Sequence, residues 1–486
     1  MVLLLPLIVP LVVAAAVLLF RGHRRATRVA LAGGCVEVAL LAYLVFQVHM
    51  QGAIAVGQYL RADGLTSWFL AGLGFIFIVT LLYSMNYLRH VPPGRFSSPR
   101  WFYCLMFLFV FAMLAAYLAL NLGLLWIMME ATTLASALLV GFYNTDGSVE
   151  AGWKYLVVCT VGIAFALFGT IALYLAAVRS GVPSESALDW TALMNAGPAM
   201  GHISNLVKLS FVFVAVGYGT KVGFVPMHSW LPDAHAEAPS PISAMLSAAL
   251  LNCAMYALLR YDAISVRALG PGFSHTMLLI FGVLSLVGAS LLMIVQRDLK
   301  RLLAYSSVEH MGMIAVGIGI GGPLGLYGAL LHTFNHSAAK ALLFFGAGRV
   351  RETYGTLELD QIKGMARTLR WTSAFMVIGV LAIIGLPPFS LFISEFAILN
   401  GAFRQEQHLI VVSVLLALVI GFGALIFQLQ RMLPGEPVAV RKSPISIAEI
   451  AAMAACACLV IGLGIHLPGA FVHMVQRAMD VVNWQH

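Results

Sequence analysis

The chain has 486 residues, of which 61% are apolar and 10% charged, and its mean hydropathy is +0.94. A soluble protein of this length could not cover its surface with so little charge, so the composition excludes a soluble globular fold. Apolar runs of about 18 residues or more recur along the chain, each long enough to cross a bilayer. We therefore expect an all-α polytopic membrane protein, since the alternation typical of a β-barrel is missing.

The formal net charge of +8 does not indicate nucleic-acid binding, because Lys and Arg stand in short segments between apolar runs and form no stripe with interleaved aromatics. The six cysteines include no C-x-x-C pair, so we expect small core residues rather than disulfides or an iron–sulfur site. No basic region precedes the first apolar run, and residues 2–20 are therefore expected to remain as the first helix.

Turn residues and charges divide the chain into fourteen predicted membrane-spanning helices. Their approximate ranges are 2–20, 27–49, 63–88, 101–119, 121–143, 152–178, 205–226, 241–262, 272–296, 303–320, 324–348, 371–401, 407–430 and 446–471. The longest predicted loop, from about 179 to 204, is too short for a soluble domain. Function is therefore expected in the helices, their short loops or partner subunits.

Basic residues are divided unevenly between the two sets of loops. The odd-numbered loops hold 19 of the 28, namely Arg21, Arg24, Arg25, Arg28, Arg89, Arg95, Arg100, Lys154, Arg297, Lys300, Arg301, Arg349, Arg351, Lys363, Arg367, Arg370, Arg431, Arg441 and Lys442. The even-numbered loops and the C-terminal tail hold six, namely Arg61, Arg179, Arg260, Arg267, Arg404 and Arg477. Loops rich in Lys and Arg stay in the cytoplasm, so both termini are predicted on the outer side.

Ionisable side chains inside a membrane helix cost about 2.5 to 3.5 kcal/mol each on insertion, so each one marks a candidate site. The predicted helices contain a short set of them, namely Glu37, Glu130, Lys208, Lys221, Glu309, His310, His332, His336, Lys340, Glu395 and Glu449.

Glu130 lies in the middle of the fifth helix, in WIMMEATTLAS, with no basic residue within reach on that helix. Either its partner lies on another helix, or the protonated carboxyl group only forms a hydrogen bond. On the seventh helix, the Gly-Tyr-Gly segment 217–219 is expected to interrupt the helix beside Lys221. An ammonium group held there, paired with Glu130, could change its protonation when the carboxylate is neutralised. Lys208 is expected to reach the outer interface.

On the eleventh helix, His332, His336 and Lys340 recur every four residues in LHTFNHSAAKALLFF. This spacing places them on one helix face over about 12 Å, as a chain of proton-exchanging groups requires. A metal or haem site is the alternative use of a histidine pair. We favour proton exchange because no acidic or cysteine ligand accompanies the face and a lysine continues it.

The twelfth helix contains IGLPPFSLFISEF, in which Gly385, Pro387 and Pro388 are expected to break the helix before Glu395. A simple proline kink is the alternative. The seventh helix has the same combination of a break and an ionisable group, five helices earlier. Because a shift by an odd number of helices inverts the topology, helices 4–8 and 9–13 are predicted to form two inverted repeats.

The predicted divisions of the chain follow from these repeats. They are helices 1–3 (residues 1–100), the first repeat (101–262), the second repeat (263–430), and helix 14 with the tail (431–486).

Three further positions have open interpretations. Glu309 and His310, near the inner end of the tenth helix, are either an entry or exit group or solvated capping residues. Glu37, central in the second helix, could feed a proton path or contact a partner subunit. Glu449 is expected to be an interfacial charge at the start of helix 14.

Five segments resemble the antiporter-like, proton-translocating subunits of respiratory complex I, membrane-bound hydrogenases and multisubunit cation/proton antiporters. They are WIMMEATTLASALLVGFYN, GYGTKVGFVPMHSWLPDAHAEAPSPISA, QRDLKRLLAYSSVEHMG, HTFNHSAAKALLFFGAG and GLPPFSLFISEF. Within this family, EATTLASALLVGFYN followed by EAGWKY is most similar to the F-type subunit of hydrogenase-4 and formate hydrogenlyase complexes, with the subunit-4-like member of complex I close.

The resemblance implies that Glu130 and Lys221 form an ion pair in the first half. It also implies that Lys340 with His332 and His336 forms a central relay, and that Glu395 ends the second half.

One departure from the family concerns the eighth helix, where Asn252 stands at the position that often carries a lysine. Asn252 and His228, which lies in the second matching segment, are secondary candidates together with Lys208, Glu309, His310 and Glu37.

The resemblance further implies a multi-pass subunit of a prokaryotic inner membrane that moves protons when a redox module drives it. The expected partners are other membrane subunits and a peripheral hydrogenase-like or NADH dehydrogenase-like module. We expect no cofactor or metal in this subunit, because the sequence has no Gly-rich phosphate loop, haem pair or metal cluster. The alternatives are a self-sufficient Na⁺/H⁺ exchanger and a passive scaffold or quinone-binding subunit.

Overall fold

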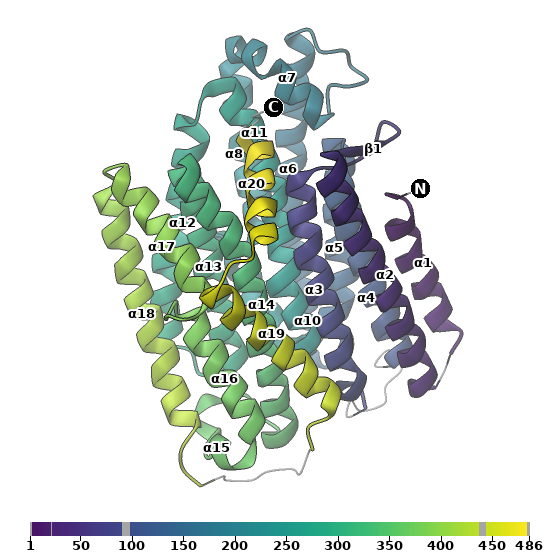
Figure 1. The fold of residues 1–486 in the computed structure, drawn as a ribbon, viewed down its shortest axis with the longest axis vertical. Helices are drawn as coiled ribbons and strands as arrows, with labels where there is room; N and C mark the ends of the chain where they lie inside the picture. Colours follow the sequence, from purple (N-terminus) through teal and green to yellow (C-terminus); the bar gives the residue numbers. More distant parts are fainter. Residues whose placement is uncertain (1, 21, 90–97, 437–443, 484–486) are drawn as a thin grey trace.

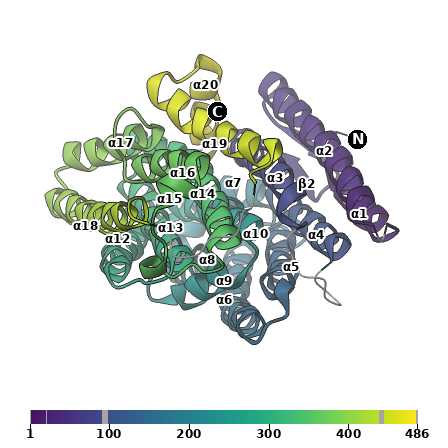
Figure 2. The same ribbon diagram turned by 90° about the horizontal axis from the view of Figure 1, so that it is seen from below.

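The computed structural model describes residues 2–20, 22–89, 98–436 and 444–483, and long helices make up nearly all of it (Figure 1). The helices run side by side between two ends of the molecule. Seen from one end, α1 and α2 form one flank of the bundle, and α18 lies at the opposite edge (Figure 2).

The longer helices correspond in order to the predicted spans. They are α1 (Leu5–Leu18), α2 (His23–Gln51), α3 (Gly64–Tyr87), α4 (Pro99–Leu118), α5 (Leu122–Val140), α6 (Asp146–Arg179), α8 (Ser204–Val222), α11 (Leu251–Leu269), α12 (Gly272–Ile294), α13 (Leu299–Ile320), α14 (Gly322–Tyr354), α16 (Arg370–Ile383), α17 (Ser390–Arg404), α18 (His408–Met432) and α19 (Ile447–Ile465).

Shorter elements fill the connections. They are β1 (Ile54–Val56), β2 (Leu60–Ala62), η1 (Gly141–Tyr143), α7 (Trp190–Met200), η2 (Gly201–Ile203), η3 (Met227–Ser229), α9 (Trp230–Glu237), α10 (Ser240–Met245), the π-helix η4 (Leu246–Leu250), η5 (Leu359–Gln361), α15 (Met365–Thr368) and α20 (Gly469–Asn483). The two strands pair antiparallel, with Ala55 opposite Arg61. The longest predicted loop thus contains a helix, α7.

Eleven helical segments of the described residues are long and apolar enough to cross a bilayer, and α1 and α16 are shorter apolar helices. The all-α polytopic fold is therefore confirmed, whereas the count of fourteen spans and the inverted repeats remain predictions. The 33-residue helix α14 is not among the eleven, although it is long enough. Its two histidines and Lys340 explain this, because they lower the hydropathy of the helix.

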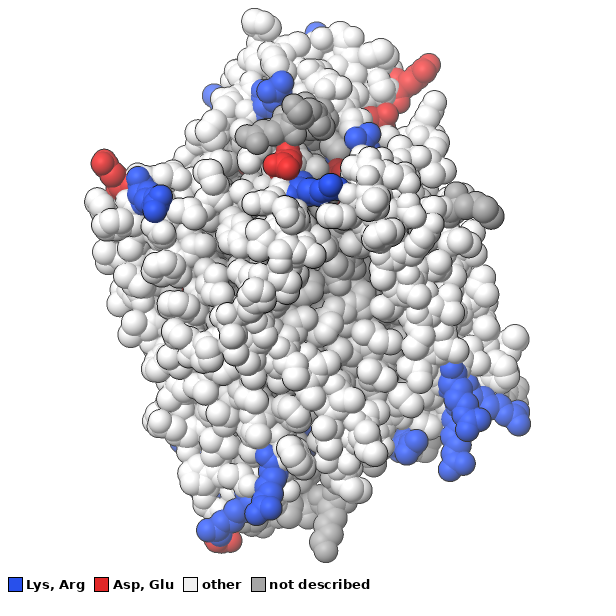
Figure 3. Space-filling model, in the orientation of Figure 1, with Lys and Arg blue, Asp and Glu red and all other residues white. Residues whose placement is uncertain are grey.

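Charged side chains on the face shown in Figure 3 lie toward its upper and lower ends, with an uncharged band between them. This is the distribution expected for a protein surrounded by lipid. Three basic residues assigned to loops are instead buried in helices: Arg260 in α11, Lys300 in α13 and Arg349 in α14. Four others that support the predicted orientation lie outside the described residues, namely Arg21, Arg95, Arg441 and Lys442.

Several helices begin at a side chain that caps their free N–H groups. The side chain of Asn121 accepts from the first turn of α5, and that of Asp298 accepts from the N–H of Arg301 in α13. Capping boxes begin α6 and α19. The cap at Asp298 starts α13 early, which is why Lys300 lies inside the helix rather than in a loop.

The break in the seventh predicted span lies later than expected. Helix α8 runs through the Gly-Tyr-Gly segment 217–219 and ends at Val222, and the chain turns at Gly223 with φ of 88°. Gly217 has a packing role instead, since a Cβ atom there would lie 2.5 Å from the backbone nitrogen of Ala166. Beyond the turn, the indole nitrogen of Trp230 donates to the freed carbonyl of Thr220 at 2.8 Å.

The predicted break in the twelfth span is confirmed. Helix α16 ends at Ile383 and α17 begins at Ser390, so the segment is two half-helices rather than one kinked helix. Gly385 adopts a φ of 68°, and its missing side chain leaves room for the carboxylate of Glu395. A residue with a Cβ atom would collide with this carboxylate.

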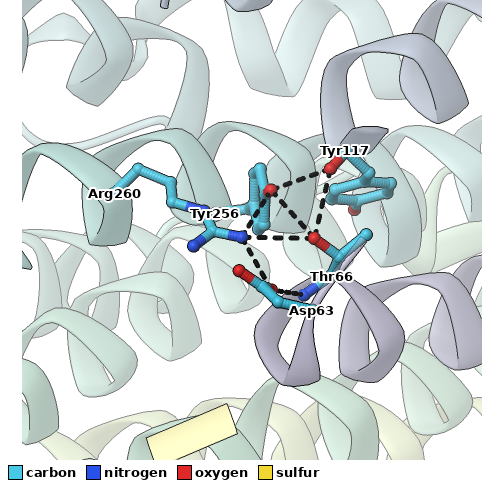
Figure 4. A network of polar contacts seen from close by, with 5 residues as sticks. All are labelled: Asp63, Thr66, Tyr117, Tyr256 and Arg260. Carbon is cyan, nitrogen blue, oxygen red and sulfur yellow. Dashed lines mark hydrogen bonds and ion pairs between the residues drawn. The ribbon is translucent and has the colours of Figure 1, made fainter. Parts of the chain in front are cut away.

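A buried ion pair joins α3 to α11 (Figure 4). The guanidinium of Arg260 donates to Asp63 Oδ1 at 2.8 Å, and the same oxygen caps α3 by accepting from the N–H of Thr66 at 2.9 Å. The guanidinium also donates to the hydroxyl of Tyr256 at 3.0 Å and lies 4.0 Å from the ring centre of Trp190. Arg260 therefore combines an ion pair with α3 and an aromatic contact with α7, and these contacts hold α3, α7 and α11 together.

Replacing Arg260 by Met should lower the free energy of unfolding by about 3 to 5 kcal/mol, because the buried carboxylate of Asp63 loses its counter-charge. Thermal unfolding of the purified protein in detergent measures this effect. Arg267→Met is the matched control, since Arg267 lies on the same helix but is exposed. Equal stability of the two variants would contradict a stabilising role for the ion pair.

Candidate functional site

The ammonium group of Lys221 is fully buried near the end of α8. It donates to the backbone carbonyl of Met129 and, at 2.5 Å, to the hydroxyl of Thr133, both on α5. The helix that carries Glu130 therefore supplies the contacts of Lys221, as predicted, but through other groups.

Glu130 and Lys221 do not form the predicted ion pair within the described structure. One oxygen of Glu130 accepts from the hydroxyl of Thr160 on α6 at 2.8 Å, and the other has no hydrogen-bond partner. The reason is the rotation of α5, which directs the Glu130 carboxylate toward α6 and the neighbouring carbonyl of Met129 toward α8. The two charges are thus one residue apart along α5 but face different helices.

Lys340 and Lys300 repeat this arrangement in the second half. Both are fully buried, and Lys340 donates to the carbonyl of Leu303 at 2.9 Å, while Lys300 donates to the carbonyl of Ala238 at 2.5 Å. Neither lysine, nor Lys221, has a carboxylate within ion-pair distance in the part of the chain that is described. Three ammonium groups are therefore held by backbone carbonyl groups rather than by counter-ions.

His332, His336 and Lys340 lie on one face of α14, as their spacing predicts, and this face is directed at α13. The rings of His332 and His336 lie 5.1 and 5.5 Å from the ring of His310, centre to centre. Lys340 reaches Leu303 on the same neighbouring helix.

A line of hydrogen bonds runs from α13 through α14 to α17. His310 Nδ1 lies 3.0 Å from His332 Nε2, and His332 Nδ1 lies 2.9 Å from the hydroxyl of Ser394. The hydroxyl of Ser394 also lies 2.9 Å from the carbonyl of Leu391. Each ring nitrogen donates or accepts according to the tautomer of its histidine, so His332 bridges His310 and Ser394 in either direction.

Glu309 and His310 are not solvated capping residues, because only 3% and 2% of their surfaces are exposed. Both stand inside α13, which packs against α14 and α17. The carboxylate of Glu309 lies against Gly421 of α18, where a side chain would collide with it. The interpretation as solvated capping residues is therefore wrong, and a role in a proton path stays a prediction.

Glu395 joins the same cluster from the second half-helix. Ligand-type atoms of His310, His332 and Glu395 all lie within 4.8 Å of one another. Glu395 Oε1 is buried and has no hydrogen-bond partner among the described residues. The break between α16 and α17 therefore brings a carboxylate to the end of the histidine line.

The eighth predicted span contains a π-helical segment, η4, between α10 and α11. Ser247 in this segment contacts the hydroxyl of Ser307 at 2.8 Å, and Ser307 donates to the same Leu303 carbonyl that accepts from Lys340. One turn later, Asn252 donates to the hydroxyl of Ser337 on α14 at 2.7 Å. Asn252, at the position where related proteins often carry a lysine, is thus hydrogen-bonded directly to α14.

The other sequence candidates lie away from this line. Glu37 is fully buried in α2, and neither of its oxygens has a hydrogen-bond partner among the residues that the structure describes. Lys208 is exposed, as expected, with its ammonium 5.9 Å from the ring centre of Phe273. His228 is partly exposed within the break after α8.

Glu449 caps α19, as its position predicted, but it is fully buried rather than interfacial. The side chain accepts from Asn86 at 3.0 Å and lies 3.6 Å from Arg349. Contacts with α3 and α14 therefore hold it inside the protein.

Sequence reasoning missed His235 and Lys300. His235 on α9 is fully buried and stacks on Phe344 at 4.9 Å between ring centres. The capping residue Asp298, three residues before Arg301, could have placed Lys300 inside a helix. No comparable signal marks His235, because its burial depends on how the segment after the break folds back.

Comparison with known proteins identifies relatives over most of the chain. The family described as NADH:quinone oxidoreductase/Mrp antiporter, TM, matches residues 119–421. A hydrogenase-4 component F homolog of Methylacidiphilum infernorum is 40% identical over 387 residues, which cover 78% of this chain and 80% of the relative. NADH-quinone oxidoreductase subunit N of Desulforudis audaxviator is 32% identical over 428 residues, with coverage of 85% and 82%.

Solved structures share the fold at lower identity. A chain of an archaeal membrane-bound sulfane sulfur reductase superposes with a TM-score of 0.87 at 22% identity, covering 99% of this chain and 97% of that one. A chain of respiratory complex I from Thermus thermophilus gives 0.83 at 23% identity, with coverage of 100% and 99%. A chain of the Mrp complex from Dietzia gives 0.85 at 18% identity, with coverage of 99% and 97%.

Replacing Thr133 by Val should lower the free energy of unfolding by about 1.5 to 3 kcal/mol, because the buried Lys221 ammonium loses a hydroxyl acceptor. Thr133→Ser keeps the hydroxyl and is the matched control. Denaturation of the two purified variants in detergent measures the difference. Equal stability would show that Thr133 does not hold the lysine.

Proposed function

Because the chain belongs to the NADH:quinone oxidoreductase/Mrp antiporter transmembrane family, we propose that it carries protons along its buried lysine and histidine side chains. It is an antiporter-like membrane subunit of the complex I and hydrogenase-4 type. The relay is proposed to use Glu130 and Lys221 in the first half, and Lys340, the histidines of α14 and Glu395 in the second. His310 and Lys300 join this set on the strength of their positions.

The observation that carries the proposal is the hydrogen-bonded line from His310 through His332 to Ser394, with Glu395 at its end. A histidine that accepts at one ring nitrogen and donates at the other can pass a proton across its ring. Both ring nitrogens of the buried His336 lack hydrogen-bond partners in the described part of the chain, and buried groups of this kind normally bind water. Water at His336 would connect the line to Lys340.

The lysines suit this role because their charge is held without a counter-ion. A fixed carboxylate at ion-pair distance would keep an ammonium group protonated, whereas a carbonyl group stabilises it less strongly. When another charged group of the complex comes closer to the lysine or moves away from it, the lysine can then release or take up a proton. Glu130, one residue from the carbonyl that holds Lys221, is placed to exert such an influence in the first half.

The partners we propose are other membrane subunits and a peripheral redox module, either hydrogenase-like or NADH dehydrogenase-like. Relatives named as hydrogenase-4 component F homolog and NADH-quinone oxidoreductase subunit N support both types. We place the chain in a prokaryotic inner membrane. The division of basic residues between the loops supports cytoplasmic odd-numbered loops and outer termini.

A stand-alone or Mrp-like Na⁺/H⁺ antiporter subunit is the second candidate, and the family's description, which includes the Mrp antiporter, supports it. Such an exchanger would use the same buried groups. Proteoliposomes containing only this chain separate the two functions. Na⁺ flux driven by a pH gradient without partner subunits supports the exchanger, and its absence together with pumping by the complex supports the redox-driven subunit.

Replacing Lys340 by Met should reduce proton pumping by the assembled complex about tenfold or more, because the proposed relay loses the ammonium group that follows the histidines on α14. Pumping per electron pair in inverted membrane vesicles measures this effect, with assembly checked on native gels.

Lys363→Met is the matched control, since Lys363 is exposed in the loop before α15. It should pump normally. Normal pumping in a fully assembled Lys340→Met complex would contradict the relay.

A further inference from the structure

His310, His332 and Glu395 have the composition and spacing of a metal site. They come from α13, α14 and α17, and each offers one ligand atom, with all three atoms within 4.8 Å of one another. Two imidazole nitrogens and one carboxylate oxygen are a ligand set of Zn²⁺ and related divalent metals. We propose that these three side chains form a Zn²⁺ site whose occupation blocks proton transfer.

The distance between the two histidines is close to that of a zinc site. Zinc bonds of about 2.0 to 2.1 Å in a tetrahedral arrangement separate two ligand nitrogens by about 3.3 Å. His310 Nδ1 and His332 Nε2 lie 3.0 Å apart. A small outward movement of the two rings therefore makes room for the metal between the two nitrogen atoms.

Ser394 already orients His332 for this role. Its hydroxyl lies 2.9 Å from His332 Nδ1, which leaves Nε2 directed at His310. A hydrogen bond to the second ring nitrogen is the usual way in which proteins orient a metal-binding histidine. With the metal bound, each neutral ring carries its one hydrogen on the nitrogen that does not bind the metal, so neutral imidazoles release no proton.

Glu395 supplies the acidic ligand that α14 itself lacks. Its side chain is 5% exposed, and Oε1 has no hydrogen-bond partner in the described chain, so the carboxylate is free to turn toward the histidines. Any proton on the carboxylate leaves to water when the metal binds. Water takes the fourth position of the tetrahedron, as in other zinc sites with three protein ligands.

The binding of Zn²⁺ does not depend on the proposed function, whereas its inhibitory effect rests on it. Zinc at this position would replace the hydrogen bond between His310 and His332 and hold both rings in one tautomer. A relay through these rings would then stop.

Calorimetric titration of Zn²⁺ into the purified full chain, treated with EDTA beforehand, tests the site. Wild type should show one tight class of binding, and His310→Gln and Glu395→Gln should weaken it by at least about 100-fold. His336→Gln is the matched control, because His336 is buried on the same helix one turn from His332 and does not belong to the site. It should bind Zn²⁺ as tightly as wild type.

Two results would overturn the site. One is unchanged binding in His310→Gln and Glu395→Gln; the other is only weak binding to wild type, as expected from exposed histidines. If either variant does not purify in monodisperse form, Ser394→Ala decides, since loss of the orienting hydrogen bond should weaken binding about 10- to 100-fold.

Proton transfer by the wild-type complex is measured separately with EDTA and with added Zn²⁺. Inhibition that EDTA reverses supports the proposed block, and transfer unaffected by bound Zn²⁺ contradicts it. Because transfer in EDTA tests the relay without metal, a failure of the zinc site and a failure of the proposed function give different results.

Discussion

An ammonium group buried in a membrane protein must find a partner for its charge, and this requirement shapes the centre of the present fold. Lys221, Lys300 and Lys340 are fully buried, and each donates to a backbone carbonyl on another element. A carbonyl group accepts from one of the three N–H groups of an ammonium without fixing its charge as a carboxylate would. The burial of the three lysines is therefore compatible with the proton exchange proposed above.

Irregular backbone provides the remaining polar groups in the same region. The turn after α8 lets the chain fold back so that Ala238 reaches Lys300, and the break before α17 brings Glu395 to the histidines. The π-helix η4 places Ser247 against Ser307, whose acceptor is also that of Lys340. Away from these positions, ordinary helices with apolar faces form the bundle, and Asp63 with Arg260 joins three of them. The groups of the proposed relay are thus different from the ion pair that joins the helices.

Much of this arrangement could be predicted from the sequence because it depends on local spacing. The face shared by His332, His336 and Lys340 follows from helical periodicity, and the break at residues 384–389 follows from glycine and proline. Contacts between helices were not predictable in the same way. The rotation of α5 turns Glu130 toward Thr160 rather than Lys221, and burial of Glu309 and His310 depends on packing against α14, α17 and α18. Lys300 was predicted in a loop because its neighbours Arg297, Asp298 and Arg301 are charged, as is typical of loops between membrane helices.

We propose that Lys340 transfers protons because no carboxylate lies within ion-pair distance of it among the described residues, and a carboxylate introduced beside it is a decisive test. Ser307 and Lys340 share the carbonyl of Leu303, so Ser307→Asp places a carboxylate beside the ammonium group. We expect proton pumping by the assembled complex to fall about tenfold or more, while Ser307→Asn, of the same size without charge, retains most of it. Equal pumping by the two assembled variants would show that the charge of Lys340 need not be free to change.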